Sequence, residues 1–158
     1  MIQRWRTHTT FIVIVGLVLI LIALVASYMS QNLRPSTELR LGSGVFSVQV
    51  AQTNDALVQG LSGTDSLAAN EGLLMVFPVG DTWGIWMKDM LIPLDIVWMD
   101  KDKKVVHIVT DASPDLGTSK TFRPEDPALY VLEVPAGTVK QSGIAVGRVA
   151  VFDIVEGK

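Results

Sequence analysis

One stretch of the chain combines charged and aromatic side chains that could form a binding site. Residues 83–100 read WGIWMKDMLIPLDIVWMD and contain three tryptophans, three aspartates and Lys88. Asp95 stands inside the apolar run LDIVWM, whose residues we expect to form a strand with side chains on alternating faces. A buried carboxylate has to be paired, hydrogen-bonded or protonated. The chemistry of this stretch therefore depends on the partner of Asp95.

Two interpretations of Asp95 are open. Lys88 is the nearest cation in sequence, seven residues earlier and across Pro93. In the first interpretation, Lys88 and Asp95 form a buried ion pair that fixes the register of a hairpin. In the second, they lie at the rim of a ligand groove with tryptophan rings that stack on a sugar or a peptide, although such rings fill β cores equally often. The candidate ligand-binding residues are then Trp83, Trp86, Lys88, Asp89, Asp95 and Asp115.

The composition excludes several other chemistries. The chain has no cysteine, which excludes zinc held by thiolates and thiol nucleophiles. From Ser30 onward it has one histidine, His107, and no Gly-x-Ser-x-Gly motif accompanies it, so a Ser-His-Asp triad is not indicated. Gly42-Ser43-Gly44 lacks the following helix of a phosphate-binding loop. We expect neither a metal nor a cofactor.

Residues 11–29, FIVIVGLVLILIALVASYM, carry no charge and predict a transmembrane helix. Their 19 residues would extend about 28 Å, close to the hydrocarbon thickness of roughly 30 Å. Arg4 and Arg6 indicate a cytoplasmic tail over residues 1–10. A cleaved signal peptide is the alternative, but a cut after Ala26 or Ser27 would leave Leu24 or Val25 where small residues are typical. The sequence predicts an uncleaved signal anchor in the plasma (inner) membrane, in contact with the lipid bilayer.

The polypeptide after this anchor is predicted to lie outside the cytosol. Two of the 13 basic side chains precede the span, so Ser30 to Lys158 has 11 basic and 16 acidic side chains and a net charge of −5. That sign does not favour nucleic acid, which selects clustered basic surfaces. The interleaved Lys101, Lys103 and Lys104 are typical of a solvated turn.

Beyond a polar linker over residues 30–37, residues 38–158 are predicted to form one domain of short strands. Glu38 to Leu41 and Val45 to Val50 resemble a hairpin, and Thr53 and Asn54 cap a short helix from Asp55 to Leu61. The other predicted elements are strands at Gly72 to Phe77, Trp83 to Met90, Leu94 to Met99, Val105 to Val109, Leu129 to Val134 and Arg148 to Val155, and a helical turn at Thr138 to Ser142.

This pattern favours a mainly β domain, an antiparallel sandwich or barrel with one or two short helices, because the long crossover helices of parallel sheets are missing. Residues 110–127, TDASPDLGTSKTFRPEDP, form the longest predicted loop. Loops of such length in a compact domain are usually functional.

Four stretches resemble the family of small exported prokaryotic proteins known as domain of unknown function 192. They are Gly60-Leu61-Ser62, residues 71–77 (EGLLMVF), residues 86–96 (WMKDMLIPLDI) and residues 130–137 (YVLEVPAG). The resemblance covers about two thirds of the chain and implies a mainly β sandwich domain behind a signal peptide or anchor, with no settled activity. Gln59 replaces the arginine of many members, and the loop cysteines of some members are absent.

The sequence leaves three kinds of function open. The first is a binding or interaction module for an envelope glycan or a protein partner. The second is a hydrolase acting on envelope saccharide through a carboxylate pair drawn from Asp89, Asp95, Asp111, Asp115 and Glu133. The third is a structural envelope protein. A glycosidase requires two carboxyl groups facing one cleft, whereas a binding groove requires aromatic and hydrogen-bonding groups.

Overall fold

The computed structural model describes residues 14–22 and 34–154. The chain divides into two compact units, Met1–Arg34 and Pro35–Lys158. In the first unit, residues 14–22 are helical, and no helix within the described residues has the length and apolarity needed to cross a membrane. The predicted tail at residues 1–10, the rest of the predicted anchor and half of the linker, residues 30–33, lie outside the described residues.

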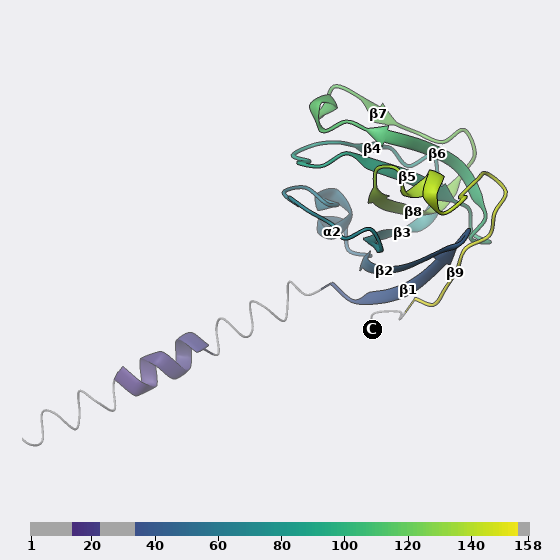
Figure 1. Ribbon diagram of the computed structural model, residues 1–158. Helices are drawn as coiled ribbons and strands as arrows, with labels where there is room; N and C mark the ends of the chain where they lie inside the picture. The colour runs from purple at the N-terminus through teal and green to yellow at the C-terminus, as the bar shows by residue number, and fades with distance from the viewer. Residues whose placement is uncertain (1–13, 23–33, 155–158) are drawn as a thin grey trace, which may run out of the picture. The chain divides into compact units, whose positions relative to one another are not determined.

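The second unit is mainly β (Figure 1). Its elements in chain order are β1 (Ser36–Leu41), β2 (Gly44–Ala51), α2 (Asn54–Gln59), β3 (Glu71–Asp81), β4 (Ile85–Trp86), β5 (Leu94–Met99), β6 (Val105–Ala112), a 3-10 turn η1 (Pro114–Leu116), β7 (Thr121–Phe122), β8 (Ala128–Pro135), α3 (Thr138–Gln141) and β9 (Val151–Phe152). The prediction of a mainly β domain with a few short helices is confirmed.

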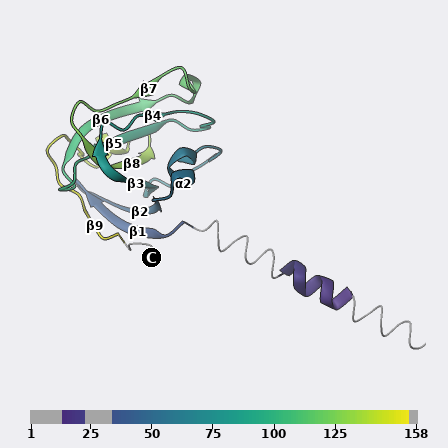
Figure 2. The same ribbon diagram turned by 180° about the vertical axis from the view of Figure 1, so that it is seen from behind.

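Seven of these strands form one curled sheet in the order β6-β5-β8-β3-β2-β1-β9, and β4 pairs with β7 in a separate ribbon. Neighbouring strands in the curled sheet are antiparallel except β2 and β3, which are parallel. Parallel neighbours require a crossover, and residues 52–70, with α2 at their start, provide it. In both Figure 1 and Figure 2, α2 lies beside β3.

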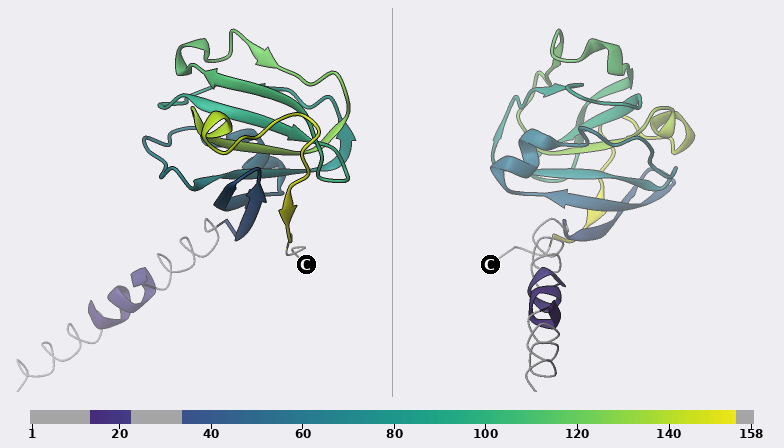
Figure 3. Two further views of the ribbon diagram at one scale, coloured as in Figure 1. Left: turned by 45° about the vertical axis from the view of Figure 1, so that its right-hand side comes forward. Right: turned by 90° about the vertical axis from the view of Figure 1, so that its left-hand side faces the viewer.

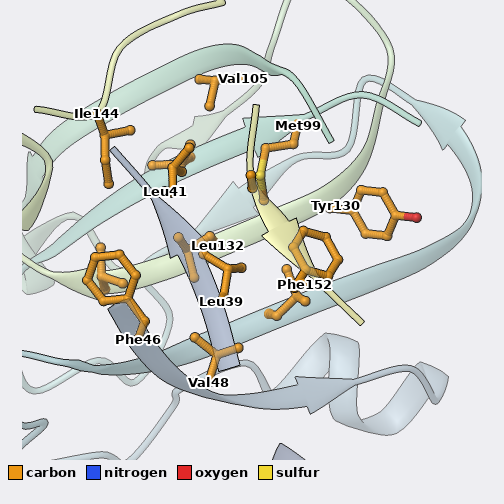
Figure 4. Packing of buried hydrophobic residues seen from close by; sticks show 14 of the residues in the cluster. Leu39, Leu41, Phe46, Val48, Met99, Val105, Tyr130, Leu132, Ile144 and Phe152 are labelled. Atoms are coloured by element: carbon orange, nitrogen blue, oxygen red, sulfur yellow. The ribbon is translucent and has the colours of Figure 1, made fainter. Parts of the chain in front are cut away.

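The concave face of the curled sheet holds one of two apolar cores (Figure 4). This inner core takes side chains from all seven strands and from α3, so both edges of the sheet bend toward it. Its buried members are Leu39, Leu41, Phe46, Val48, Leu74, Val97, Met99, Val105, Tyr130, Leu132, Val134, Val139, Ile144, Ala150 and Phe152.

The opposite face of the central strands holds the outer core, which the β4–β7 ribbon and α2 cover. Its buried members are Ala51, Leu61, Leu73, Met75, Phe77, Ile85, Met87, Met90, Leu94, Ile96, Trp98, Ala112, Phe122, Ala128 and Val131. Leu57 of α2 packs against this core, whereas Val139 of α3 belongs to the inner core. The right-hand view of Figure 3 accordingly shows α2 and α3 on opposite sides of the sheet.

The last described segment connects the two edges of the curled sheet at one end. The Val105 amide donates to the Arg148 carbonyl and the Ala150 amide donates to the Lys103 carbonyl, before β9 pairs with β1. Residues 148–155 were expected to form one strand, but only Val151–Phe152 does so in the described part. The residues before it bond to the β6 side instead.

Two further sequence predictions are corrected by the structure. Residues 83–90 form a strand only at Ile85–Trp86, because the Met87 amide donates to the Gly117 carbonyl and the Asp89 carbonyl accepts from Gly63, both loop residues. The lysine-rich turn between β5 and β6 is not wholly solvated. Lys103 Nζ donates to the Phe152 carbonyl at 2.6 Å and lies 4.4 Å from its ring centre.

Lys101 fits the predicted solvated turn. It is fully exposed, and its hydrogen bond to Asp102, followed by the charge of that carboxylate, raises the pKa of the lysine. His107 is half-buried and packs edge-on against Trp98, with 5.2 Å between the ring centres. This position agrees with a structural role for the histidine.

Candidate functional site

Asp95 lies on the inner face of β5, beside Val97, and is fully buried. Its Oδ2 accepts the Val139 amide at 2.8 Å, and its Oδ1 accepts the Asp111 amide at 2.9 Å. The first bond caps α3, whose N-cap Gly137 has no side chain for that purpose. The second holds the irregularity in the β5–β6 register between Leu94 and Ile96. Asp95 therefore joins three elements.

The predicted ion pair between Lys88 and Asp95 is wrong. Among the described residues, the carboxylate near Lys88 is that of Asp89, with 4.0 Å between Lys88 Nζ and Asp89 Oδ2. The Lys88 side chain is 51% exposed. Asp95 is satisfied by two backbone amides rather than by a lysine. Backbone amides fulfil the requirement of a buried carboxylate as well as an ion pair does, and sequence spacing does not reveal them.

The outer face of the sheet carries a pocket of about 290 Å³ between α2, the end of β3 and the segment around β4. Most of its lining is apolar or aromatic. The lining residues are Asn54, Leu57, Val58, Gln59, Gly60, Leu61, Ser62, Met75, Phe77, Pro78, Trp83, Gly84, Ile85, Trp86, Met90 and Glu133. This volume is near the lower end of the roughly 300–1,000 Å³ typical of ligand pockets.

One wall of the pocket is aromatic and rigidly held. Trp83 stacks on Phe77 with 4.4 Å between ring centres and 9° between the planes. The Trp83 indole N–H donates to the Val79 carbonyl at 2.9 Å, and the Trp83 carbonyl accepts the indole N–H of Trp98 from the outer core. Trp86, also in the lining, keeps 42% of its surface exposed at the mouth. Both tryptophans thus contribute to the surface that a ligand would meet.

The opposite wall is α2 and the turn that follows it. The Thr53 hydroxyl caps the helix by accepting the Ala56 amide, and Gly60 ends it with φ 53° and ψ −130°, a conformation that favours glycine. The Ser62 hydroxyl then donates to the Lys88 carbonyl at 2.8 Å, which ties this turn to the segment after β4. No residue of α2 is buried. This wall is consequently held by its two ends and by the partly buried Ala56 and Leu57, which pack against the outer core.

Glu133 supplies the carboxylate of the pocket. It lies in the middle of β8, and its register neighbours Leu73 of β3 and Ile96 of β5 are buried members of the outer core. Only 4% of Glu133 is exposed. A Cβ atom at Gly60 would lie 3.7 Å from one carboxylate oxygen and 4.0 Å from the other, so the turn after α2 passes close to this group. Glu133 is the one charged residue in the pocket lining.

Two of the six predicted ligand-binding residues, Trp83 and Trp86, line this pocket. Lys88 and Asp89 form the exposed turn after β4, Asp115 is exposed in η1, and Asp95 lies on the other face of the sheet. The structure therefore does not bring the six together.

The sequence alone does not single out the other groups of the pocket, which are α2, the two methionines and Phe77. Glu133 was considered only as one of five carboxylates for hydrolysis. A signal for it was present, because Glu133 interrupts the apolar run YVLEV just as Asp95 interrupts LDIVWM.

Comparison with known proteins places the whole β domain in one family. Residues 37–152 match the model of domain of unknown function 192, which is described as an uncharacterized ACR. The chain belongs to the domain of unknown function 192 family. The resemblance deduced from the four sequence stretches is thereby confirmed.

Relatives within and around the domain of unknown function 192 family carry little functional information. A UPF0127 protein of Thermococcus gammatolerans is 29% identical over 94 residues, which are 56% of this chain and 56% of the relative. The chain thus spans just over half the length of that relative.

Two solved structures resemble this chain, each with a TM-score of 0.67. One is described as a candidate transcription regulator from Sinorhizobium meliloti; it is 28% identical, and the match covers 74% of this chain and 92% of the other. The second is a protein of unknown function from Novosphingobium aromaticivorans; it is 27% identical, with 73% and 83% covered.

Proposed function

We propose that this protein is a binding module whose outer-face pocket receives part of an envelope partner. The observation that carries the proposal is the pocket itself, in which two tryptophans, Phe77 and two methionines surround one buried carboxylate. Ligand sites are typically concave, mostly apolar and provided with a few placed polar groups. The Trp83–Phe77 stack preforms one wall, so a ligand does not have to order it.

A protein partner fits this pocket better than an envelope glycan does. Saccharides present hydroxyl groups on most sides and require several hydrogen-bonding partners, whereas the polar side chains of the lining are Asn54, Gln59, Ser62 and Glu133. The remaining side chains of the lining are apolar or aromatic. Such a surface matches the apolar side chains of a polypeptide segment.

The hydrolase hypothesis finds no second carboxylate in the pocket. A glycosidase needs two carboxyl groups facing one cleft, about 5 to 10 Å apart. Glu133 faces the pocket, but Asp95 faces the inner core, and Asp89, Asp111 and Asp115 are not among the lining residues. The pocket therefore supports binding rather than hydrolysis by a carboxylate pair.

We also propose that residues 11–29 hold the module at the outer face of a plasma membrane. The uncharged 19-residue stretch and the preceding Arg4 and Arg6 support this location. Protease added to spheroplasts should digest the β domain. Protection of the domain, or a mature N-terminus near Ser27, would contradict the proposed anchor.

Site-specific photo-crosslinking in living cells tests the binding function. Val58 lines the pocket and is 61% exposed, and Val146 is 63% exposed and is not part of the lining, which makes it a matched control. A photoreactive phenylalanine analogue at position 58 should give a discrete adduct with a protein, and the same analogue at position 146 should not.

A pocket-filling variant makes this test specific. Leu57→Trp enlarges a pocket-lining side chain that is only partly buried against the outer core, so the pocket should narrow while the strands of the sheet stay packed. Circular dichroism of the variant checks that the domain is folded. The adduct at position 58 should then disappear. An adduct that persists in Leu57→Trp, or equal adducts from positions 58 and 146, would contradict the proposal. An adduct with a saccharide would show that the partner is a glycan and not a protein.

A further inference from the structure

We infer that the pocket receives a lysine or arginine side chain of the partner protein, with the cationic head group at Glu133. The inference rests on the proposed function and specifies its ligand. The protein segment would lie across the mouth of the pocket, and the aliphatic stem of its basic residue would pass between the apolar walls.

The charge of the pocket selects a cation. Glu133 is the one charged residue among the sixteen described residues that line it, so the charge of this lining is negative. A ligand that fills the pocket displaces water, and charge attraction is stronger where water is excluded. Anionic groups would meet repulsion from Glu133 without a compensating cation in the lining.

The walls of the pocket match the rest of a basic side chain. Lysine and arginine bury their methylene stems along apolar surfaces while the charged head reaches a polar group. Leu61, Met75 and Met90 offer such a surface, and Trp83 and Trp86 offer aromatic faces. Aromatic faces attract ammonium and guanidinium groups. One side chain would thus use the apolar walls, the tryptophans and the carboxylate together.

The surroundings of the pocket favour a polypeptide over a small free cation. Val58 and Trp86 remain exposed at the mouth of the pocket. A small amine would fill the pocket but leave these two apolar side chains in water. A segment several residues long would cover them.

Selection from a random peptide library tests this inference without a known partner. A phage-displayed library of dodecapeptides is panned against the full chain in lipid nanodiscs, and peptides from the selection are synthesised. They should share one lysine or arginine flanked by apolar residues. Their dissociation constants should rise about 10- to 100-fold in Glu133→Gln, because a hydrogen bond between two charged groups is lost. The exposed Glu125→Gln is the matched control and should change binding by less than about 2-fold.

A second pair of variants keeps the test independent of the folding of Glu133→Gln. Val58→Arg places a cation at the mouth of the pocket and should weaken binding of the basic peptides several-fold. Val146→Arg, at an equally exposed valine outside the lining, should leave it unchanged. Equal effects of the two arginines would show attraction to the net charge of the protein only, and would contradict the inference.

The remaining outcomes separate this inference from the proposed function. Selected peptides that lack a shared basic residue, yet lose binding in Leu57→Trp, would overturn the inference and leave the binding function intact. Peptides unaffected by Leu57→Trp, or no enrichment over empty nanodiscs, would overturn both. If n-propylguanidinium or n-butylammonium binds as tightly as the peptides, the pocket takes a small cation, and the inference that a protein segment occupies it is wrong.

Discussion

Two buried acids lie on neighbouring strands of the same sheet and face opposite ways. Asp95 of β5 faces the inner core, and Glu133 of β8 faces the outer core; the residue opposite Glu133 in the β5–β8 register is Ile96, the next residue after Asp95. Asp95 accepts two backbone amides at 2.8 and 2.9 Å and is closed off from solvent. Glu133 forms part of the wall of a pocket.

The difference shows that burial alone does not reveal the role of an acid. The role of a buried acid depends on which groups lie next to its carboxylate. Asp95 meets the first turn of α3 and the irregular part of β6, so its charge is used within the fold. Glu133 lines a pocket whose other described lining residues are uncharged, so a cation that enters the pocket can approach it.

Removal of the inner acid should destabilise the fold strongly. Asp95→Ala deprives the Val139 and Asp111 amides of their acceptor and leaves them buried, which should lower the free energy of unfolding by about 3 to 5 kcal/mol. Asp95→Asn keeps one acceptor oxygen and should cost about half as much. Denaturant unfolding of the full chain, followed by circular dichroism, measures both. A loss below about 1 kcal/mol for Asp95→Ala would contradict the structural role.

Loss of the α2 cap should have a smaller and local effect. Thr53→Ala removes the hydroxyl that accepts the Ala56 amide and should destabilise the helix by about 1 kcal/mol. Amide hydrogen exchange should rise in residues 54–59 but stay unchanged in β8. Faster exchange throughout the sheet would show that α2 belongs to the cooperative core, contrary to its lack of buried residues.

Neutralisation of the outer acid should leave stability almost unchanged. Glu133→Gln keeps the size of the side chain and removes a charge that lies between Leu73 and Ile96. We expect a change of less than about 1 kcal/mol in either direction, because a buried charge loses solvation that its local contacts only offset. The same denaturant titration measures it beside Asp95→Asn. If Glu133→Gln lowers the free energy of unfolding as much as Asp95→Ala does, both acids have a structural role and the contrast between them is wrong.

The smallest effect is expected at Lys88. Its side chain is half exposed and its nearest described carboxylate is Asp89 at 4.0 Å, so Lys88→Ala should change the free energy of unfolding by less than about 0.5 kcal/mol. The double variant with Asp95→Ala should be additive within about 0.5 kcal/mol. Partial rescue of the stability of Asp95→Ala by Lys88→Ala would instead support the buried ion pair that the sequence suggests.

Much of the fold could be predicted from local patterns. The hairpin of β1 and β2 follows from alternation around Gly42 to Gly44, and β5 spans the predicted Leu94 to Met99. Thr53 was expected as a helix cap and acts as one. These features depend on neighbouring residues. The parallel pairing of β2 with β3 depends on a crossover of 19 residues and has no local signature.

The site could be predicted only in part for the same reason. Trp83 and Trp86 stood out by type and spacing, but the opposite wall comes from α2 and the floor from β8, some 25 and 50 residues away. The partners of Asp95 are backbone amides 16 and 44 residues later, and any residue type supplies an amide. Charged side chains alone therefore point to Lys88 as the partner of Asp95, although the amide of Val139 forms the bond.

The most direct test of the contrast between the two acids is a double-mutant cycle across the pocket. One arm is Glu133→Gln in the full chain, the other replaces the basic residue of a selected peptide by norleucine, and isothermal titration calorimetry gives the four dissociation constants. Contact between the carboxylate and the cation predicts a coupling of at least about 1.5 kcal/mol. A coupling within about 0.5 kcal/mol of zero would show that Glu133 does not meet the ligand and would contradict the account.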